Sequence, residues 1–336
     1  MKVAFFNPKD WEREYIKNNT TKDLEISFFE HALDANHIPD ETDFEAITVF
    51  VDSTVDEEVL DKFSNLRFIT TRSTGYDHID LEACKKRDIE VSNVPDYGAN
   101  TVAEFTFGLL LSLVRKIHIG YDQVRETGSF SVEGLRGIDL QGKKLGVVGT
   151  GHIGRNVIRI ARGFGMDVIA YDKFPNEDLA KKYEFEYKNL NDVFRESDII
   201  TLHVPYSKET HHMIDQEVLN EIISDNAYLV NTSRGGIVDT EALVHALKNG
   251  KLAGAALDVL EEEGVIKDEL QFFVEGHPHE VNLKTVLANH ILIDMPNVIV
   301  TPHNAFNTKE ALLRILDTTL SNLQTFVDGE VDNKVS

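Results

Sequence analysis

The chain has 336 residues, 42% of them hydrophobic, and its 57 acidic side chains against 34 basic ones give a net charge of −23. That length exceeds the usual size of one domain, so we expect two. The acidic excess is spread along the chain and disfavours nucleic acid and anionic membrane surfaces as partners, although local arginines can still bind a small anion. We expect neither a membrane span nor a signal peptide. The single cysteine, Cys84, cannot form an internal disulfide, which fits a reducing cytoplasm.

Residues 1–98 alternate short apolar runs with polar, helix-like segments such as 54–65. The runs that we expect to be strands are 3–6, 46–51, 66–71 and 89–94. Such alternation is typical of βαβ units in a parallel sheet. The stretch 100–117 that follows is long, mostly apolar and free of proline. It predicts one buried helix suited to domain or subunit packing.

The alternation of strands and helices restarts at residue 144. Expected strands are 144–149, 166–172, 197–205, 227–233, 252–259 and 297–303; expected helices include 155–165, 240–250 and a final amphipathic helix over 308–329. These strands are apolar and β-branched without polar alternation, as a doubly wound sheet covered on both faces requires. The fold class predicted for the chain is therefore α/β.

Three glycines in the first turn of this second region form a G-x-G-x-x-G motif: Gly149, Gly151 and Gly154. The motif follows a predicted strand, opens a predicted helix and is followed by Asp172 at the end of the next strand, as in dinucleotide-binding folds. The glycines permit a tight turn and close approach to a pyrophosphate, which the helix amino terminus attracts. Asp172 would accept hydrogen bonds from ribose hydroxyls and repel a 2′-phosphate. We therefore predict NAD rather than NADP, although the neighbouring Lys173 weakens that preference.

Later strands of a doubly wound sheet end in loops that line one crevice, so their last residues are candidate ligands. Arg234, the glutamates at 261–263 and His303 follow three of these strands. Each has an ordinary explanation when taken alone: a surface ion pair, a solvated loop and a polar side chain in a turn. Together, beside a dinucleotide motif, they indicate a catalytic site. The strand ends supply four further candidates for cofactor binding: Val204, Pro205, Thr232 and Ser233.

Taken in order, these motifs resemble the D-isomer-specific 2-hydroxyacid dehydrogenases over nearly the whole chain. The resemblance is carried by residues 72–84, 102–116, 145–157, 197–214, 229–243, 254–263 and 298–306. It implies that Arg234 binds the substrate carboxylate and that His303 is the acid/base. A bidentate arginine can align a 2-oxo acid with a hydride donor, and a histidine can protonate the carbonyl oxygen as negative charge develops there.

The resemblance also provides a carboxylate partner for the histidine. The partner lies five residues after Asp258, which gives Glu263; spacing alone could not choose it over Glu261 or Glu262. A carboxylate beside an imidazole favours the imidazolium form. Asp258 itself matches the family's aspartate on the nicotinamide side.

Four more positions are implied by the same resemblance. The amides of Thr74 and Gly75 match those that help to hold the substrate carboxylate. His152 and Ile153 match the pyrophosphate contacts.

The family implies two doubly wound parallel-sheet domains. Residues 1–98 with 307–336 would form a flavodoxin-like substrate domain, and residues 99–306 a Rossmann NAD-binding domain, with a cleft that closes on substrate. The helix at 100–117 matches the place where family dimers pack, so we expect a homodimer.

The substrate expected is a small 2-oxo acid, pyruvate, reduced reversibly to D-lactate. Tyr97 and Phe306 match aromatics that close over the substrate's third carbon in lactate-type members, although hinge packing would also explain them. The segment 264–296 resembles the extended insert of those members. The alternatives are a sibling enzyme for glyoxylate, hydroxypyruvate or a bulkier 2-oxo acid, and a non-catalytic module that senses NAD.

Four histidines outside these motifs raise the question of a metal: His211, His212, His277 and His279. Their spacing matches no zinc signature, and hydride transfer to NAD needs no metal in this design. We therefore expect no metal site.

Overall fold

The computed structural model describes residues 1–263 and 282–335. It divides into two compact units, Met1–Tyr97 with Asn307–Ser336, and Gly98–Phe306. The first unit is therefore discontinuous in sequence. Within the described residues, no helix has the length and apolar character needed to cross a membrane.

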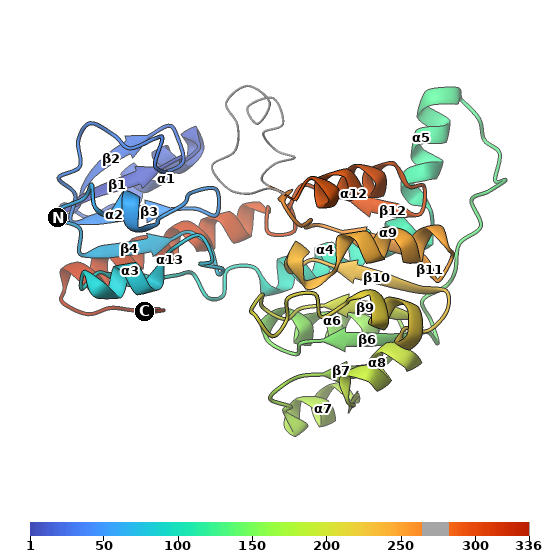
Figure 1. The fold of residues 1–336 in the computed structure, drawn as a ribbon. Helices are drawn as coiled ribbons and strands as arrows, with labels where there is room; N and C mark the ends of the chain where they lie inside the picture. The colour runs from blue at the N-terminus through green and yellow to red at the C-terminus, as the bar shows by residue number, and fades with distance from the viewer. Residues whose placement is uncertain (264–281, 336) are drawn as a thin grey trace. The chain divides into compact units, whose positions relative to one another are not determined.

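The first unit contains a five-stranded parallel sheet with the strand order β2-β1-β3-β4-β5 (Figure 1). Its strands are β1 (Lys2–Phe6), β2 (Glu25–Phe29), β3 (Ala46–Val49), β4 (Phe68–Thr71) and β5 (Glu90–Ser92). Its helices are α1 (Asp10–Asn19), α2 (Glu57–Leu60), α3 (Leu81–Lys86) and α13 (Lys309–Val327). The order changes direction between β1 and β3, as in flavodoxin-like folds.

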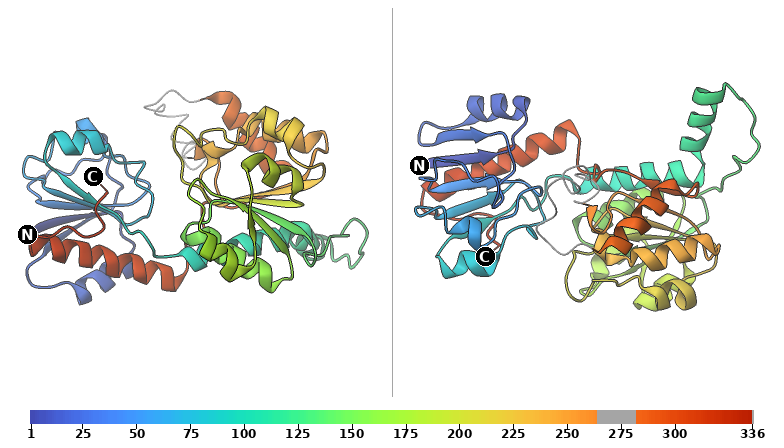
Figure 2. Two further views of the ribbon diagram at one scale, coloured as in Figure 1. Left: turned by 90° about the horizontal axis from the view of Figure 1, so that it is seen from below. Right: turned by 45° about the horizontal axis from the view of Figure 1, so that its top comes forward.

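Alternate residues of β1 explain why helices cover both faces of this sheet. Val3 and Phe5 are buried in one cluster with Ile16 of α1 and residues of α13. Ala4 and Phe6 are buried in a second cluster with residues of α2 and α3. Successive side chains of a strand point to opposite faces, so a strand without a polar face needs cover on both. Helix α13, from the end of the chain, lies with α1 on the first of these faces (Figure 2).

The second unit contains a seven-stranded parallel sheet with the order β12-β11-β10-β9-β6-β7-β8 (Figure 1). Its strands are β6 (Lys144–Val148), β7 (Asp167–Tyr171), β8 (Glu186–Tyr187), β9 (Ile199–Leu202), β10 (Ala227–Asn231), β11 (Leu252–Leu257) and β12 (Val298–Val300). Its helices are α4 (Ala99–Val114), α5 (Ile117–Thr127), α6 (His152–Gly163), α7 (Glu177–Tyr183), α8 (Leu190–Glu196), α9 (Thr240–Lys248) and α12 (Leu283–Asp294), with short turns η1 (Val218–Ile222) and η2 (Gly235–Ile237). The predicted α/β class, with two doubly wound sheets, is confirmed.

Two hydrophobic clusters lie on opposite faces of this second sheet. Leu145 and Val147 of β6 are buried with residues of α4 and α6. Val148, the next residue along, is buried with residues of α8, α9 and α12. Both faces are thus covered, and the edge formed by the carboxyl ends of the strands is left to carry polar loops.

The prediction of one helix over 100–117 is wrong at its end. Helix α4 stops at Val114, and Lys116 adopts a left-handed conformation with φ of 52° before α5 begins. Nine residues of α4 are buried, and its contacts with α6 fix it within its own unit. Helix α5, described over its whole length, has no buried residue. The predicted helix therefore runs past the end of α4 and includes Ile117, the first residue of the unburied α5.

The insert predicted at 264–296 is described only in part, because residues 264–281 lie outside the described residues. The remainder forms α12, whose N-cap Asn282 accepts a hydrogen bond from the backbone of Lys284. Strand β2 was not predicted. It is an edge strand with an exposed glutamate and four half-buried residues, so its apolar signal is weak.

Candidate active site

The glycine motif lies at the point where the strand order of the second sheet reverses. Strands β6 and β9 are neighbours there, and the chain leaves β6 through residues 149–151 to enter α6. Loops at this point of a doubly wound sheet diverge and leave room for a ligand. Gly151, which has no side chain, is the N-cap residue of α6. The amino end of that helix can therefore receive a phosphate on its backbone N–H groups.

Each of the three glycines meets a different structural requirement. Gly149 has φ of 95°, and a Cβ there would lie 2.7 Å from the carbonyl oxygen of His203. A Cβ at Gly154 would overlap the carbonyl oxygen of Gly149, so the helix and the loop could not pack as they do. A Cβ at Gly151 would meet no described atom within 4 Å, so this backbone is open to close approach. The loop fits the pyrophosphate of a dinucleotide.

Asp172 follows β7 and is tied to the glycine loop. Its Oδ2 accepts hydrogen bonds from the backbone N and the hydroxyl of Thr150 at 2.7 and 2.9 Å. Its Oδ1 accepts one from the backbone N of Phe174 at 2.9 Å. A carboxylate offers about four acceptor positions, so capacity remains for a ribose hydroxyl.

Lys173 raised doubt about the preference for NAD because its charge could attract a 2′-phosphate. Its Nζ lies 2.6 Å from Oε2 of Glu209, and this ion pair raises the pKa of Lys173. The lysine therefore has a local counter-charge, which weakens the case for NADP.

The loops after β9 and β10 meet beside this region. The hydroxyl of Ser233 donates to the carbonyl of Val204, and the hydroxyl of Thr232 lies 3.1 Å from that of Thr106 on α4. Pro205 is exposed. These contacts hold the backbone of both predicted cofactor loops.

Arg234 is half-buried, at the start of the short turn η2. Its carbonyl accepts a hydrogen bond from Asn231 Nδ2 at 2.9 Å, and Asn231 Oδ1 accepts one from the backbone N of Ser233 at 3.0 Å. Asn231, which the sequence analysis did not select, thus fixes the loop that carries the arginine. The available signal was a polar residue at the end of an otherwise apolar strand. On the next residue, Gly235, a Cβ would overlap the backbone of Leu260, so this loop packs directly on the glutamate loop.

His303 and Glu263 form a direct pair. Nδ1 of the histidine lies 2.8 Å from Oε1 of the glutamate, and the two side chains are 22% and 32% exposed. A carboxylate at Nδ1 fixes the ring and its tautomer, so Nε2 becomes the nitrogen that exchanges a proton. This pair has the composition of a general acid/base with its orienting group.

The other two glutamates have different surroundings. Glu261 Oε1 lies 2.7 Å from Nε2 of His212, and Oε2 accepts hydrogen bonds from the backbone N and the hydroxyl of Thr240. Glu261 therefore holds the loop after β11 to the segments that carry His212 and Thr240. Glu262 is exposed, with φ of 52°. Sequence spacing could not separate these three residues, whereas their partners do.

The turn that carries His303 is built around Asp258. This fully buried carboxylate accepts hydrogen bonds from the Thr301 hydroxyl and from the backbone N atoms of Asn304 and Ala305. Burial raises the pKa of Asp258, while these hydrogen bonds act in the opposite direction. His303 itself has φ of 51°, a conformation that costs energy outside glycine and that the turn must enforce.

A second histidine, His203, lies at the end of β9 beside Gly149. Its Nε2 is 2.9 Å from the hydroxyl of Thr201, and burial lowers its pKa to about 3. It therefore stays neutral at ordinary pH. His203 is therefore unsuited to the acid/base role that was predicted for His303.

In the first unit, Thr74 and Gly75 follow β4. Thr74 is exposed and Gly75 half-buried. The Thr74 hydroxyl donates to the carbonyl of Val94 at 2.7 Å, and the Ser73 hydroxyl donates to the carbonyl of Gly75 at 2.6 Å. The loop is thus held by its own side chains, and its backbone amides are available as the predicted ligands.

Tyr97 and Phe306 lie at the two points where the chain passes from one unit to the other, and both are half-buried. The carbonyl of Tyr97 accepts a hydrogen bond from Arg314 Nε of α13 at 2.5 Å, within the first unit. Their predicted contact with substrate stays a prediction.

Among the described residues, no three His, Cys, Asp or Glu side chains are placed to share a metal ion. The rings of His211 and His212 stack on each other, with centroids 3.9 Å apart. The other two histidines considered, His277 and His279, lie outside the described residues.

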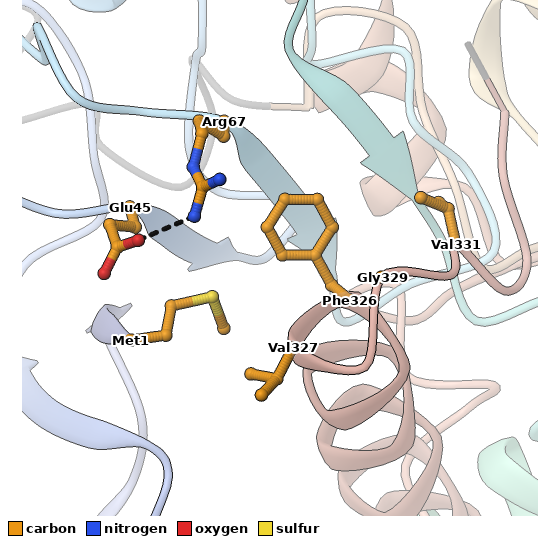
Figure 3. A pocket seen from close by; sticks show the side chains of 7 residues that line it. All are labelled: Met1, Glu45, Arg67, Phe326, Val327, Gly329 and Val331. Atoms are coloured by element: carbon orange, nitrogen blue, oxygen red, sulfur yellow. Dashed lines mark hydrogen bonds and ion pairs between the residues drawn. The ribbon is translucent and has the colours of Figure 1, made fainter.

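Figure 3 shows a cavity in the first unit, lined by residues that include Met1, Glu45, Arg67 and Phe326. Three of its lining residues, Met1, Glu45 and Arg67, immediately precede β1, β3 and β4. Arg67 and Glu45 form an ion pair across it at 2.7 Å. The predicted site residues of this unit follow the strands instead, so this cavity is not part of the candidate site.

Comparison with known proteins identifies the family of the chain. The family model described as "D-isomer specific 2-hydroxyacid dehydrogenase, NAD binding domain" matches residues 107–305. The chain is 41% identical over 334 residues, 98% of each chain, to the "2-hydroxyacid dehydrogenase homolog" of Zymomonas mobilis. It is 42% identical to the "aromatic 2-oxoacid reductase" of Clostridium sporogenes over 287 residues, 84% of this chain and 83% of the relative. Among solved structures, D-lactate dehydrogenase from Aquifex aeolicus complexed with NAD and lactic acid matches with a TM-score of 0.86 and 37% identity, covering 97% of this chain and 96% of that one. The chain therefore belongs to the D-isomer-specific 2-hydroxyacid dehydrogenases, and its cofactor is NAD.

Proposed function

We propose that the protein catalyses the reversible, NADH-dependent reduction of a small 2-oxo acid, pyruvate, to the D-2-hydroxy acid, D-lactate. The observation that carries this proposal is the pair of His303 and Glu263, 2.8 Å apart, on loops at the carboxyl edge of an NAD-binding sheet. Arg234 lies on a neighbouring strand-end loop of the same sheet.

Each residue has a role that follows from its chemistry. Arg234 binds the carboxylate of the 2-oxo acid through its planar fork, with the amides of Thr74 and Gly75 as further donors. When bound, NADH supplies the hydride that reduces carbon 2. His303 donates a proton from Nε2 to the carbonyl oxygen, and Glu263 stabilises the imidazolium that precedes this step. In the reverse direction, His303 accepts the proton of the hydroxyl group.

Several residues are proposed to hold the cofactor. The backbone of Gly151, His152 and Ile153 binds the pyrophosphate, and Asp172 accepts hydrogen bonds from the ribose. Asp258 lies on the nicotinamide side; its burial and its bonds to the His303 turn support a second role in holding that turn.

Pyruvate is favoured over larger acids because two aromatic side chains, Tyr97 and Phe306, are proposed to restrict space around the third carbon. The similarity to a D-lactate dehydrogenase supports this choice. The similarity to an aromatic 2-oxoacid reductase favours the rival, a phenylpyruvate-type substrate.

A series of kcat/KM values for pyruvate, 2-oxobutyrate, 2-oxoisocaproate and phenylpyruvate separates these substrates. We expect a graded decline from pyruvate, because one methylene group changes discrimination only ~10–200-fold. A maximum at phenylpyruvate would transfer the assignment to aromatic acids, and a maximum at hydroxypyruvate would transfer it to that sibling class. A protein that binds NADH but turns over none of these acids would instead be an NAD-binding module.

We further infer that the protein is a cytoplasmic homodimer, joined through α5 and the loop after it rather than through α4. The large apolar side chains exposed there are Ile117 (54%), Tyr121 (62%), Val124 (41%), Phe130 (87%) and Val132 (82%). Ile117, Tyr121 and Val124 follow helical spacing along one face of α5, which suits a second copy of the chain. Sedimentation of Tyr121→Asp should show loss of the dimer, whereas Trp11→Asp, at an exposed apolar residue of α1, should remain dimeric.

A further inference from the structure

The loop that carries Thr74 and Gly75 is held by a second loop, after β5. Val94 donates from its backbone N to the carbonyl of Ser73 at 3.0 Å, and Asn93 Nδ2 donates to the carbonyl of Thr74 at 2.7 Å. Two consecutive carbonyl groups therefore point toward this second loop. Since a trans peptide plane carries its C=O and N–H groups in opposite directions, the N–H groups of Thr74 and Gly75 point away from it. Consecutive N–H groups turned the same way form a concave site for an anion.

Asn93 is in turn held by the end of the chain. It is 6% exposed, and its carbonyl accepts a hydrogen bond from Asn322 Nδ2 of α13 at 3.0 Å. The same Nδ2 donates to the hydroxyl of Thr70 on β4 at 3.2 Å. Asn322 Oδ1 accepts a hydrogen bond from Asn333 Nδ2 at 2.8 Å, and the carbonyl of Asn333 accepts one from the backbone N of Asn93 at 3.1 Å. These bonds close a ring of three asparagines.

The burial of Asn322 shows that this ring is specifically built. Asn322 is fully buried within α13, where an unpaired amide would be costly, and both ends of its amide group are paired. Asn333 has φ of 52°, a conformation that asparagine adopts more readily than most residues. The chain before and after Asn333 is hydrogen-bonded to β5. The carbonyl of Asp332 accepts a hydrogen bond from the Ser92 hydroxyl at 2.6 Å, and the backbone N of Val335 donates to the carbonyl of Val91 at 2.9 Å.

We propose that Asn93 is a positioning residue for the carboxylate-binding amides of Thr74 and Gly75, and that Asn322 and Asn333 keep Asn93 in place. This proposal rests on the proposed function, because the orientation of these amides affects turnover only if they bind the carboxylate of a 2-oxo acid. The NAD loop and the His303–Glu263 pair belong to the other unit. Loss of the ring should therefore raise KM for the 2-oxo acid and leave the Kd for NADH unchanged.

The test uses two variants. Asn93→Ala removes the donor to the carbonyl of Thr74, and Asn322→Leu removes the donor to the carbonyl of Asn93 while keeping a side chain of similar size. Thr319→Val is the matched control. Thr319 is also fully buried on α13, but its hydroxyl donates to Ile315 of its own helix. The measurements are KM and kcat for pyruvate, or for the best 2-oxo acid found, the Kd for NADH, Tm, and a crystal structure of Asn93→Ala.

We expect KM to rise about tenfold in Asn93→Ala, the effect of losing one hydrogen bond of ordinary strength, and somewhat less in Asn322→Leu. Thr319→Val should lower Tm without raising KM. Unchanged KM in both asparagine variants, or an equal rise in the control, would overturn the proposal. If the wild-type protein reduces no 2-oxo acid, the proposed function fails instead. In that case the crystal structure of Asn93→Ala is the remaining test of the positioning role. If the peptide between residues 74 and 75 has the same orientation as in the wild type, the positioning role is wrong.

Discussion

The groups proposed to bind and convert the substrate differ in kind between the two units. In the second unit, the proposed groups are the side chains of Arg234, Glu263 and His303, on loops that follow three strands. In the first unit, the proposed ligands are backbone amides, oriented by the buried asparagines Asn93 and Asn322. Side-chain chemistry can be changed by one substitution, whereas amide geometry depends on supports far away in sequence. Substitutions of Glu263 and His303 should therefore affect the chemical step, substitutions of Arg234 should affect both binding and the chemical step, and substitutions of the asparagines in the first unit should affect substrate binding.

The largest effect is expected from His303→Ala. Loss of the general acid should lower kcat by roughly 10²–10⁴-fold while the Kd for NADH stays near the wild-type value. Stopped-flow turnover and fluorescence titration of NADH measure these two quantities. Turnover close to wild type would remove His303 from the chemical step.

Arg234→Lys should come next. Lysine keeps the positive charge but loses the planar fork, so pyruvate should lose both alignment and affinity, with kcat/KM reduced about 100-fold by analogy with a lost charged, bidentate contact. NADH titration provides the control, since the affinity for the cofactor should not change. If KM and kcat for pyruvate both stayed the same, another group would have to hold the carboxylate.

Glu263→Gln should lower kcat for reduction roughly tenfold, less than His303→Ala does, and leave the Kd for NADH unchanged. The carboxylate 2.8 Å from Nδ1 orients the imidazole, and a neutral amide holds the ring less firmly. Glu261→Gln is the matched control: its carboxylate contacts His212 and Thr240, so it should lower Tm without lowering kcat. The opposite pattern would transfer the role to Glu261.

Asp172→Ala should have the smallest effect on the rate of reduction. Its main effect should be a weaker preference for NADH over NADPH. The wild-type protein should prefer NADH, and the variant should use NADPH relatively better because the repulsion of a 2′-phosphate is removed. The ratio of kcat/KM for the two cofactors measures this. Lys173→Ala serves as control, because it removes an exposed ion pair with Glu209 and should leave the preference for NADH intact.

Much of the second unit could be predicted because its signals are local. The glycine motif, the apolar strands and Asp172 lie within one strand-helix-strand unit, and the fold and the cofactor followed from them. The order of strand ends also brought Arg234 and His303 to one edge. The break at Lys116 was missed because the apolar pattern continues across it.

The details that decide the site depended on contacts between distant residues. Glu263 and Glu261 differ in their partners, His303 and His212, which lie 40 and 49 positions away in sequence. Asn93 and Asn322 are 229 positions apart, and neither carries a motif. A single sequence shows residue types and periodicity, whereas these pairings appear only once the chain has folded.

The most direct test of the central claim is NADH oxidation by the wild-type protein with pyruvate, followed by chiral analysis of the product. The proposed mechanism predicts stoichiometric conversion of NADH and pyruvate into NAD and D-lactate, with the reaction largely lost in His303→Ala. Production of L-lactate, or the absence of NADH oxidation with any 2-oxo acid while NADH still binds, would contradict it.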